Sequence, residues 1–177
     1  MPETRAVFFD RDGTLMEEVD YCRDPAHVRA FPGLAAELRK LKDQGWKIII
    51  ITNQSGIGRG YFTTEEYQAV QAELERQLGG IIDATYFCPD HPDLPSTRRK
   101  PAPGMVEEAA RDWDIDLAAS WFVGDKSVDV DCGKAAGCRT ILVLTGYGQS
   151  QAEKIQPDHI TPDALAAIEL ILSSESR

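Results

Sequence analysis

Two carboxylates one residue apart are the most chemically informative feature of this sequence. Asp10 and Asp12 follow the apolar run 6–9 and precede Gly13, which can take a tight turn. The apolar run predicts a buried strand, and open α/β sheets bind ligands at the C-terminal ends of such strands. Two unpaired carboxylates in that position are costly unless a cation compensates them, and Mg²⁺ suits carboxylate oxygens. The run therefore predicts a magnesium site, whereas the alternative is a turn that caps a helix.

Polar residues stand at or directly after the C-terminal ends of three further segments. They are Thr52 and Asn53 after the run 48–51, Lys100 in the cationic run 98–100, and Asp125 after the run 122–124. A threonine after a strand is also typical of a turn or cap, and a cationic run is also typical of solvated surface. Hydroxyl and amide groups can however be aimed at developing charge, and a lysine before a helix can offset a carboxylate.

The elements that must position these residues alternate along the chain. Strand-like runs are expected at 6–9, 47–52, 81–87, 120–123 and 140–144, and helices at 34–41, 63–78, 103–112, 128–136 and 163–172. Strands that alternate with helices require crossover connections, which favour a parallel sheet. We therefore expect an α/β fold, a Rossmann-like three-layer sandwich with a mainly parallel central sheet, formed by residues 1–177 as a single domain.

Composition limits the partners. The formal net charge of -10 argues against nucleic acid or an anionic membrane surface. We find no apolar segment long enough to span a bilayer and no signal-peptide pattern at the N-terminus, so we expect a cytoplasmic protein. In that compartment the four cysteines are expected as free thiols.

The order of these motifs resembles the haloacid dehalogenase superfamily of phosphohydrolases, whose first motif is Asp-x-Asp-Gly-Thr. The resemblance implies that Asp10 is the nucleophile that forms an aspartyl-phosphate and that Asp12 is the general acid and base. It assigns Thr52 to the transferring phosphoryl group, with Asn53 as an added donor, and Lys100 to the charge of the nucleophile.

The resemblance also implies the metal ligands. Asp10, the backbone carbonyl of Asp12, and Asp125 would hold Mg²⁺, with water completing an octahedron. Asp129 would either contact a metal-bound water or cap the following helix, since a carboxylate in the first turn is also favoured by the helix dipole. The segments 16–32 and 88–103 are too short for a separate domain, so we expect a capless member whose loops select the substrate.

Two segments narrow the resemblance. Residues 54–63 and 99–105 are similar to the D-glycero-D-manno-heptose 1,7-bisphosphate 7-phosphatase family, which is close to histidinol-phosphate phosphatase. The resemblance implies an enzyme of heptose biosynthesis for lipopolysaccharide precursors, acting on a phosphorylated sugar, and we expect a monomer. Arg59 and Arg99 would contact the substrate's remote groups, because a planar guanidinium suits a second phosphate.

One departure concerns zinc. The family usually carries a Cys-x-His and Cys-x-Cys zinc loop, but here Cys88 and His91 stand at altered spacing and residues 96–98 replace the second pair. A structural zinc site requires four ligands, so zinc is not expected.

Two alternative functions remain open from the sequence. Histidinol-phosphate phosphatase would use the same chemistry on an amine-bearing substrate. A phosphoryl-receiving signalling module would also use strand-end aspartates, a threonine and a lysine. Asp12 argues against the receiver, because an acid-base carboxylate beside the nucleophile hastens hydrolysis of the phosphoaspartate.

Overall fold

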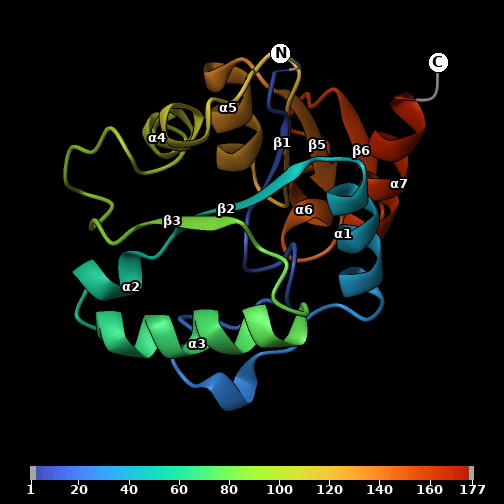
Figure 1. The fold of residues 1–177 in the computed structure, drawn as a ribbon. Coiled ribbons are helices and arrows are strands. Elements are labelled where there is room, and N and C mark those ends of the chain that lie inside the picture. The colour runs from blue at the N-terminus through green and yellow to red at the C-terminus, as the bar shows by residue number, and fades with distance from the viewer. Residues whose placement is uncertain (1–2, 176–177) are drawn as a thin grey trace.

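A single parallel sheet forms the centre of the protein, which is described here by a computed structural model for residues 3–175. The strand order is β3-β2-β1-β4-β5-β6, and every pairing is parallel (Figure 1). The strands are β1 (Ala6–Phe9), β2 (Lys47–Asn53), β3 (Ala84–Cys88), β4 (Trp121–Gly124), β5 (Arg139–Val143) and β6 (His159–Thr161). The expected α/β class and parallel sheet are confirmed.

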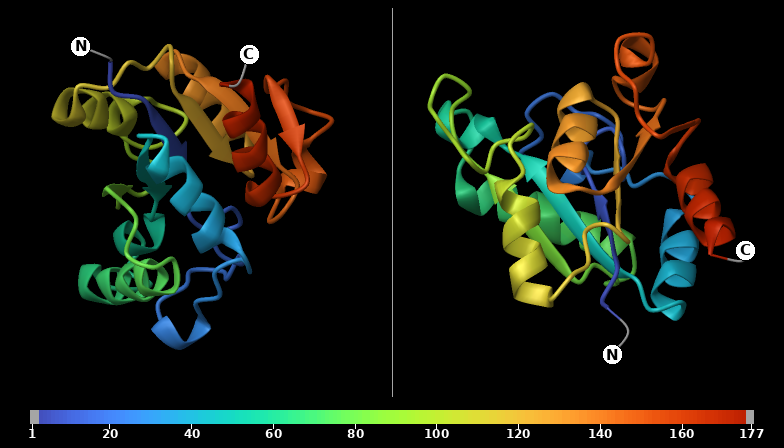
Figure 2. Two further views of the ribbon diagram at one scale, coloured as in Figure 1. Left: turned by 45° about the vertical axis from the view of Figure 1, so that its right-hand side comes forward. Right: turned by 90° about the horizontal axis from the view of Figure 1, so that it is seen from above.

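Helices cover both faces of this sheet (Figure 2). The main helices are α1 (Leu34–Asp43), α3 (Thr64–Gln77), α4 (Gly104–Trp113), α5 (Ser127–Ala136) and α7 (Ala164–Ser174). Shorter helical turns are η1 (Pro25–His27), α2 (Ser55–Gly58) and α6 (Gly148–Gln151). No helix within residues 3–175 has both the length and the apolar character needed to cross a membrane.

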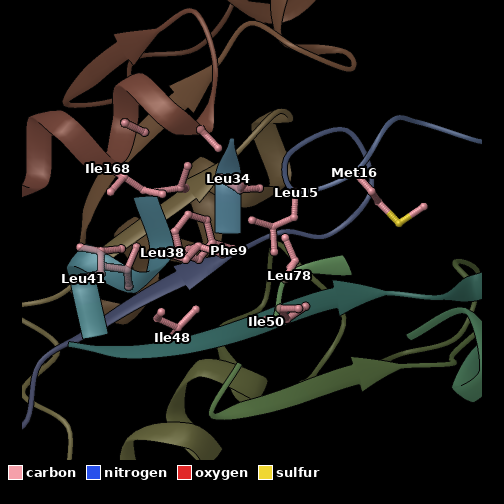
Figure 3. Packing of buried hydrophobic residues seen from close by; sticks show 14 of the residues in the cluster. Phe9, Leu15, Met16, Leu34, Leu38, Leu41, Ile48, Ile50, Leu78 and Ile168 are labelled. Atoms are coloured by element: carbon pink, nitrogen blue, oxygen red, sulfur yellow. The ribbon is translucent and has the colours of Figure 1, made fainter. Parts of the chain in front are cut away.

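The core is divided by the sheet because strand side chains alternate between its faces. Val7 and Phe9 of β1 belong to the cluster that contains residues of α1, α3 and α7 (Figure 3). Ala6 and Phe8 belong to the opposite cluster, which contains residues of α4 and α5. Burial on both faces explains why β1 and β2 are almost continuously apolar.

Local sequence signals account for the helices as well. Leu34, Leu38 and Leu41 lie on one buried face of α1. Thr63 and Glu66 form the expected capping box of α3, each side chain bonding the other's backbone N–H at 3.1 Å.

The third strand begins later than the sequence predicts. It starts at Ala84 rather than at residue 81. Asp83, directly before it, bonds β2 through its side chain as well as its backbone, instead of by the regular strand pairing that begins at Ala84. The Asp83 N–H donates to Ile48 O, and its carboxylate accepts from Ile48 N, each at 2.8 Å. The short elements β6, α2 and α6 were not predicted.

Parallel strands end at the same side of the sheet. Because β1 lies between β2 and β4, the residues that follow these three strands converge. This side of the sheet carries the candidate site.

Candidate active site

Lys100 lies at the centre of the convergent strand ends. Its Nζ donates to Asp10 Oδ1 at 2.8 Å, to Asp129 Oδ1 at 2.6 Å and to the carbonyl of Ile51 at 2.9 Å. The lysine is 3% exposed, so both charge pairs are shielded from water. The sequence prediction that a lysine joins the Asp10 carboxylate therefore agrees with this geometry.

The contact between Lys100 and Asp10 stabilises the charged form of both side chains. Burial alone would raise the pKa of Asp10, but the nearby Lys100 ammonium holds that pKa below its usual value. Burial opposes the charge of Lys100 too, and the carboxylates of Asp10 and Asp129 outweigh it and raise the lysine pKa. Asp10 is thus kept as a carboxylate, the form that a nucleophile needs.

Asn53 fixes the backbone of Lys100. Its Oδ1 accepts from Lys100 N at 3.0 Å, and its Nδ2 donates to Lys100 O at 3.1 Å. The side chain at the end of β2 therefore holds the loop that carries the lysine, a role that the sequence did not predict for it.

Asp125 follows β4 and sits against two glycine turns. A Cβ on Gly13 or Gly146 would lie only 2.3 or 2.2 Å from Asp125 Oδ2, and both glycines have positive φ. Asp125 Oδ2 accepts from Tyr147 N at 2.9 Å, whereas Oδ1 is buried without a hydrogen-bond partner. Burial, together with the neighbouring carboxylates Asp10 and Asp129, raises the pKa of Asp125 to about 9.

These carboxylates fit a divalent cation. Ligand atoms of Asp10, Asp125 and Asp129 lie within 4.8 Å of one another. The unpartnered Asp125 oxygen and the repulsion among buried carboxylates both favour a hard cation at this point. The residues present could therefore hold the metal that the sequence predicts.

Asp129 already uses both of its oxygens. Oδ1 accepts from Lys100 Nζ, and Oδ2 accepts from the backbone N–H of Lys126 at 3.1 Å, at the start of α5. Burial and the charge of Asp10 raise the pKa of Asp129 to about 6. Of the two roles that the sequence left open, capping of the helix is the one with a hydrogen bond in the structure.

Asp12 lies beside this cluster and is less buried. Arg11 bonds both of its oxygens, at 3.0 and 3.3 Å, and Gln54 Nε2 donates to Oδ2 at 3.1 Å. The same amide donates to Thr52 Oγ1 at 2.9 Å. Asp12 and Thr52 are therefore joined through Gln54.

A cavity of about 360 Å³ opens above these groups. It is lined by Asp12, Glu18, Val19, Asp20, Tyr21, Cys22, Asn53, Gln54, Ser55, Gly56, Phe62, Arg99, Lys126, Val128 and Tyr147. Of the two arginines expected to contact substrate, Arg99 lines the cavity, whereas Arg59 is exposed and lies outside the lining.

Glu18 and Lys126 are two charged lining residues that the sequence did not predict. Glu18 is half-buried, and burial together with the charge of Asp12 raises its pKa to about 7. Lys126 places its Nζ 4.7 Å from the ring centroid of Tyr147, and its ammonium interacts electrostatically with the carboxylates of Asp10 and Asp125. The position of Lys126 directly after Asp125 was the available signal, whereas no local pattern marked Glu18.

In the segment that corresponds to the family's zinc loop, side-chain hydrogen bonds join the residues. The Ser96 hydroxyl donates to Asp90 Oδ2 at 2.6 Å and accepts from the N–H groups of Arg98 and Arg99. The Cys88 thiol donates to the same Asp90 oxygen at 3.3 Å. The cysteine that resembles a zinc ligand is thus engaged with a carboxylate.

Comparisons with known proteins identify the family. The HAD-hydrolase-like family model matches residues 97–167. A D-glycero-D-manno-heptose-1,7-bisphosphate 7-phosphatase from Thermosynechococcus vestitus is 40% identical over 185 residues, covering 94% of each chain. A D-glycero-beta-D-manno-heptose-1,7-bisphosphate 7-phosphatase from Bordetella bronchiseptica is 37% identical over 149 residues, covering 82% of this chain and 83% of that protein.

A solved structure extends the similarity to the whole fold. The crystal structure of D,D-heptose 1,7-bisphosphate phosphatase from B. bronchiseptica, complexed with magnesium and phosphate, superposes with a TM-score of 0.90. It is 33% identical and covers 97% of this chain and 99% of that chain. This protein therefore belongs to the D-glycero-D-manno-heptose-1,7-bisphosphate 7-phosphatase family of haloacid dehalogenase-like phosphatases.

Proposed function

We propose that this protein hydrolyses the 7-phosphate of D-glycero-D-manno-heptose 1,7-bisphosphate through an aspartyl-phosphate. The buried contact between Lys100 and Asp10 carries the proposal, because it maintains an ionised carboxylate two residues before Asp12, which lines the cavity. The relatives that are named as 7-phosphatases of this bisphosphate support the choice of substrate. Asp12, which Gln54 holds two residues after the nucleophile, argues against a receiver module, because an acid-base carboxylate there hastens hydrolysis of the phosphoaspartate.

The proposed reaction has two steps. A carboxylate oxygen of Asp10 attacks phosphorus while the bond from phosphorus to the sugar oxygen breaks, and Asp12 gives its proton to that oxygen. Asp12 then takes a proton from water, which attacks phosphorus and releases inorganic phosphate and the Asp10 carboxylate. Thr52 donates to a phosphoryl oxygen, and Lys100 holds the nucleophile in place.

We assign the metal to Asp10, Asp125 and the backbone carbonyl of Asp12, which would hold Mg²⁺. Such an ion supplies positive charge that offsets repulsion between the nucleophile and the phosphoryl group. The oxygen donors and the free Asp125 Oδ1 support this assignment. The neighbouring crystal structure with magnesium and phosphate supports it as well.

We assign the sugar and its second phosphate to the open part of the cavity. Arg99 has a buried Nη1 without a hydrogen-bond partner, and together with Lys126 it gives the lining two cations. Asn53 also lines the cavity and binds the backbone of Lys100. Arg59 would reach the substrate from the exposed rim.

We also propose that the enzyme is a cytoplasmic monomer. The four cysteines are buried free thiols, as suits a reducing compartment.

The direct test is an assay of the purified protein with Mg²⁺ and a panel of phosphate esters. We expect the highest kcat/KM for D-glycero-D-manno-heptose 1,7-bisphosphate, with phosphate released from carbon 7. Each anomer should be assayed separately, since the relatives include enzymes named for either one. A higher kcat/KM for histidinol phosphate would instead assign the alternative substrate and reject the heptose proposal.

Arg99→Ala is expected to discriminate between substrates. The loss in kcat/KM should be about 100-fold for the bisphosphate and at most a few-fold for a simple alkyl monophosphate, because binding of the remote phosphate helps to orient the reacting one. Arg59→Ala should act in the same direction with a smaller effect, since its side chain is exposed.

Arg111→Ala is a matched control, because Arg111 is exposed on α4 and lies outside the cavity lining. It should leave both substrates unaffected. Equal losses on the two substrates in Arg99→Ala would contradict the assignment to the remote phosphate.

A further inference from the structure

Gln54 is a buried amide that connects two groups of the proposed reaction. Its side chain donates to Asp12 Oδ2 at 3.1 Å and to Thr52 Oγ1 at 2.9 Å, and the residue is 6% exposed. Its backbone is fixed as well, since the N–H donates to the carbonyl of Cys88 at 2.8 Å and the residue precedes α2. The amide therefore has little freedom to leave this position.

The orientation of the amide follows from its neighbours. In the structure the NH₂ group of Gln54, rather than its oxygen, faces Asp12 Oδ2, and a carboxylate oxygen can accept this hydrogen bond. The second hydrogen of that NH₂ then points to Thr52 Oγ1 and makes the hydroxyl an acceptor in this contact. The hydroxyl proton of Thr52 is thereby left free to donate elsewhere.

Arg11 fixes Asp12 from the other side. It is 1% exposed, and its guanidinium bonds both oxygens of Asp12 while lying 5.4 Å from the ring centroid of Tyr67. Asp12 is thus held by a cation on one side and by the Gln54 amide on the other. Two anchors restrict the rotation of the carboxylate more than one would.

We propose that Gln54 is a positioning residue that aligns the acid-base carboxylate of Asp12 with the phosphoryl-binding hydroxyl of Thr52. Through one NH₂ group Gln54 holds Asp12 within reach of the leaving oxygen of the substrate. The same group leaves the Thr52 proton free to donate to a phosphoryl oxygen. This inference rests on the proposed phosphatase function and extends it to a residue that acts through Asp12 and Thr52.

The two roles predict different dependences on the leaving group. A sugar alkoxide needs a proton from Asp12, whereas the phenolate of para-nitrophenyl phosphate leaves almost without one. Donation by Thr52 to the phosphoryl group matters for both esters. The value of kcat/KM covers the steps up to departure of the alcohol, so it isolates the acid role from later hydrolysis of the phosphoenzyme.

The experiment compares Gln54→Ala with the wild type on both esters. We expect kcat/KM to fall about 100-fold for the sugar phosphate and about 10-fold for para-nitrophenyl phosphate, since a lost positioning contact weakens acid catalysis and one phosphoryl contact. The sugar phosphate used is whichever one the wild type hydrolyses best. Failure of the heptose assignment is therefore seen with the wild type alone and does not affect this comparison.

Gln54→Glu separates hydrogen bonding from packing. It keeps the size of the side chain but places an oxygen beside Asp12 Oδ2, so it should lose at least as much activity as Gln54→Ala. If packing alone mattered, Gln54→Glu would be nearly as active as the wild type, and that result would overturn the proposal.

Gln71 on α3 offers a matched control. It is also buried and also donates to a threonine hydroxyl, Thr85 Oγ1 at 3.2 Å, but it lies outside the cavity lining. Gln71→Ala should change kcat/KM by less than about two-fold on either ester, even if its melting temperature falls as far as that of Gln54→Ala. Equal losses on the two esters in Gln54→Ala, or the same selectivity in Gln71→Ala, would overturn the assigned role.

Discussion

Asp10→Asn should reduce phosphate release to the background rate for every ester tested. The substitution keeps the shape of the side chain but removes the negative charge that Lys100 stabilises and the oxygen that attacks phosphorus. It also removes an oxygen ligand from the carboxylate cluster. Steady-state phosphate release and trapping of a phosphoenzyme on an acid quench would both be measured, and neither should be detected.

Asp12→Asn is the informative control for that result. With para-nitrophenyl phosphate it should still form a phosphoenzyme, because the leaving group needs little protonation, and the intermediate should then accumulate for lack of a base. A burst of nitrophenol followed by slow turnover is the expected signature. Near-normal turnover by Asp10→Asn would reject the covalent mechanism, whatever Asp12→Asn does.

The residues that meet at the C-terminal ends of the strands could be predicted because each lies at or directly after the end of a buried strand. Parallel pairing brings the ends of β1, β2 and β4 together, so the positions of Asp10, Thr52 and Asp125 follow from topology alone. Lys100 comes from a loop, and its place beside Asp10 was inferred from resemblance to a motif. The structure supplies the physical reason, since Asn53 binds both backbone polar groups of Lys100.

Other parts of the site depend on contacts between distant segments. Glu18 and Asp12 are drawn together by the fold of the loop after β1, for which no short pattern exists. Gln54 did leave a signal: it stands two residues after Thr52, and side chains two apart at a strand end share a face. The sequence does not show that one amide joins Thr52 to Asp12, because that requires the position of both partners.

Short elements were missed for a different reason. The strand β6 has three residues, of which His159 and Ile160 are exposed, so it lacks the apolar run by which the other strands were recognised. The helices α2 and α6 have four residues each and no apolar periodicity to detect. By contrast, α1 was predicted from the spacing of Leu34, Leu38 and Leu41, and α3 was predicted from its capping box.

Chelation of divalent metal should abolish activity without unfolding the protein. Lys100 and Lys126 interact with the carboxylates of Asp10, Asp125 and Asp129. These two cations therefore still offset part of the repulsion among the carboxylates when the metal is removed. Far-ultraviolet circular dichroism should stay unchanged after treatment with a chelator, and added Mg²⁺ should restore turnover. Loss of the folded signal on chelation would show that metal holds the fold itself.

The same preparation should contain no stoichiometric zinc. A structural zinc site requires four ligands and contributes directly to folding. In the loop that resembles the zinc segment, Cys88 donates to Asp90 and His91 Nδ1 accepts from the N–H of Asp93 at 3.1 Å, so both candidate ligands already have protein partners. Elemental analysis would test this, and one zinc per chain, together with a lower melting temperature after a zinc-selective chelator, would show that Cys88 and His91 are ligands after all.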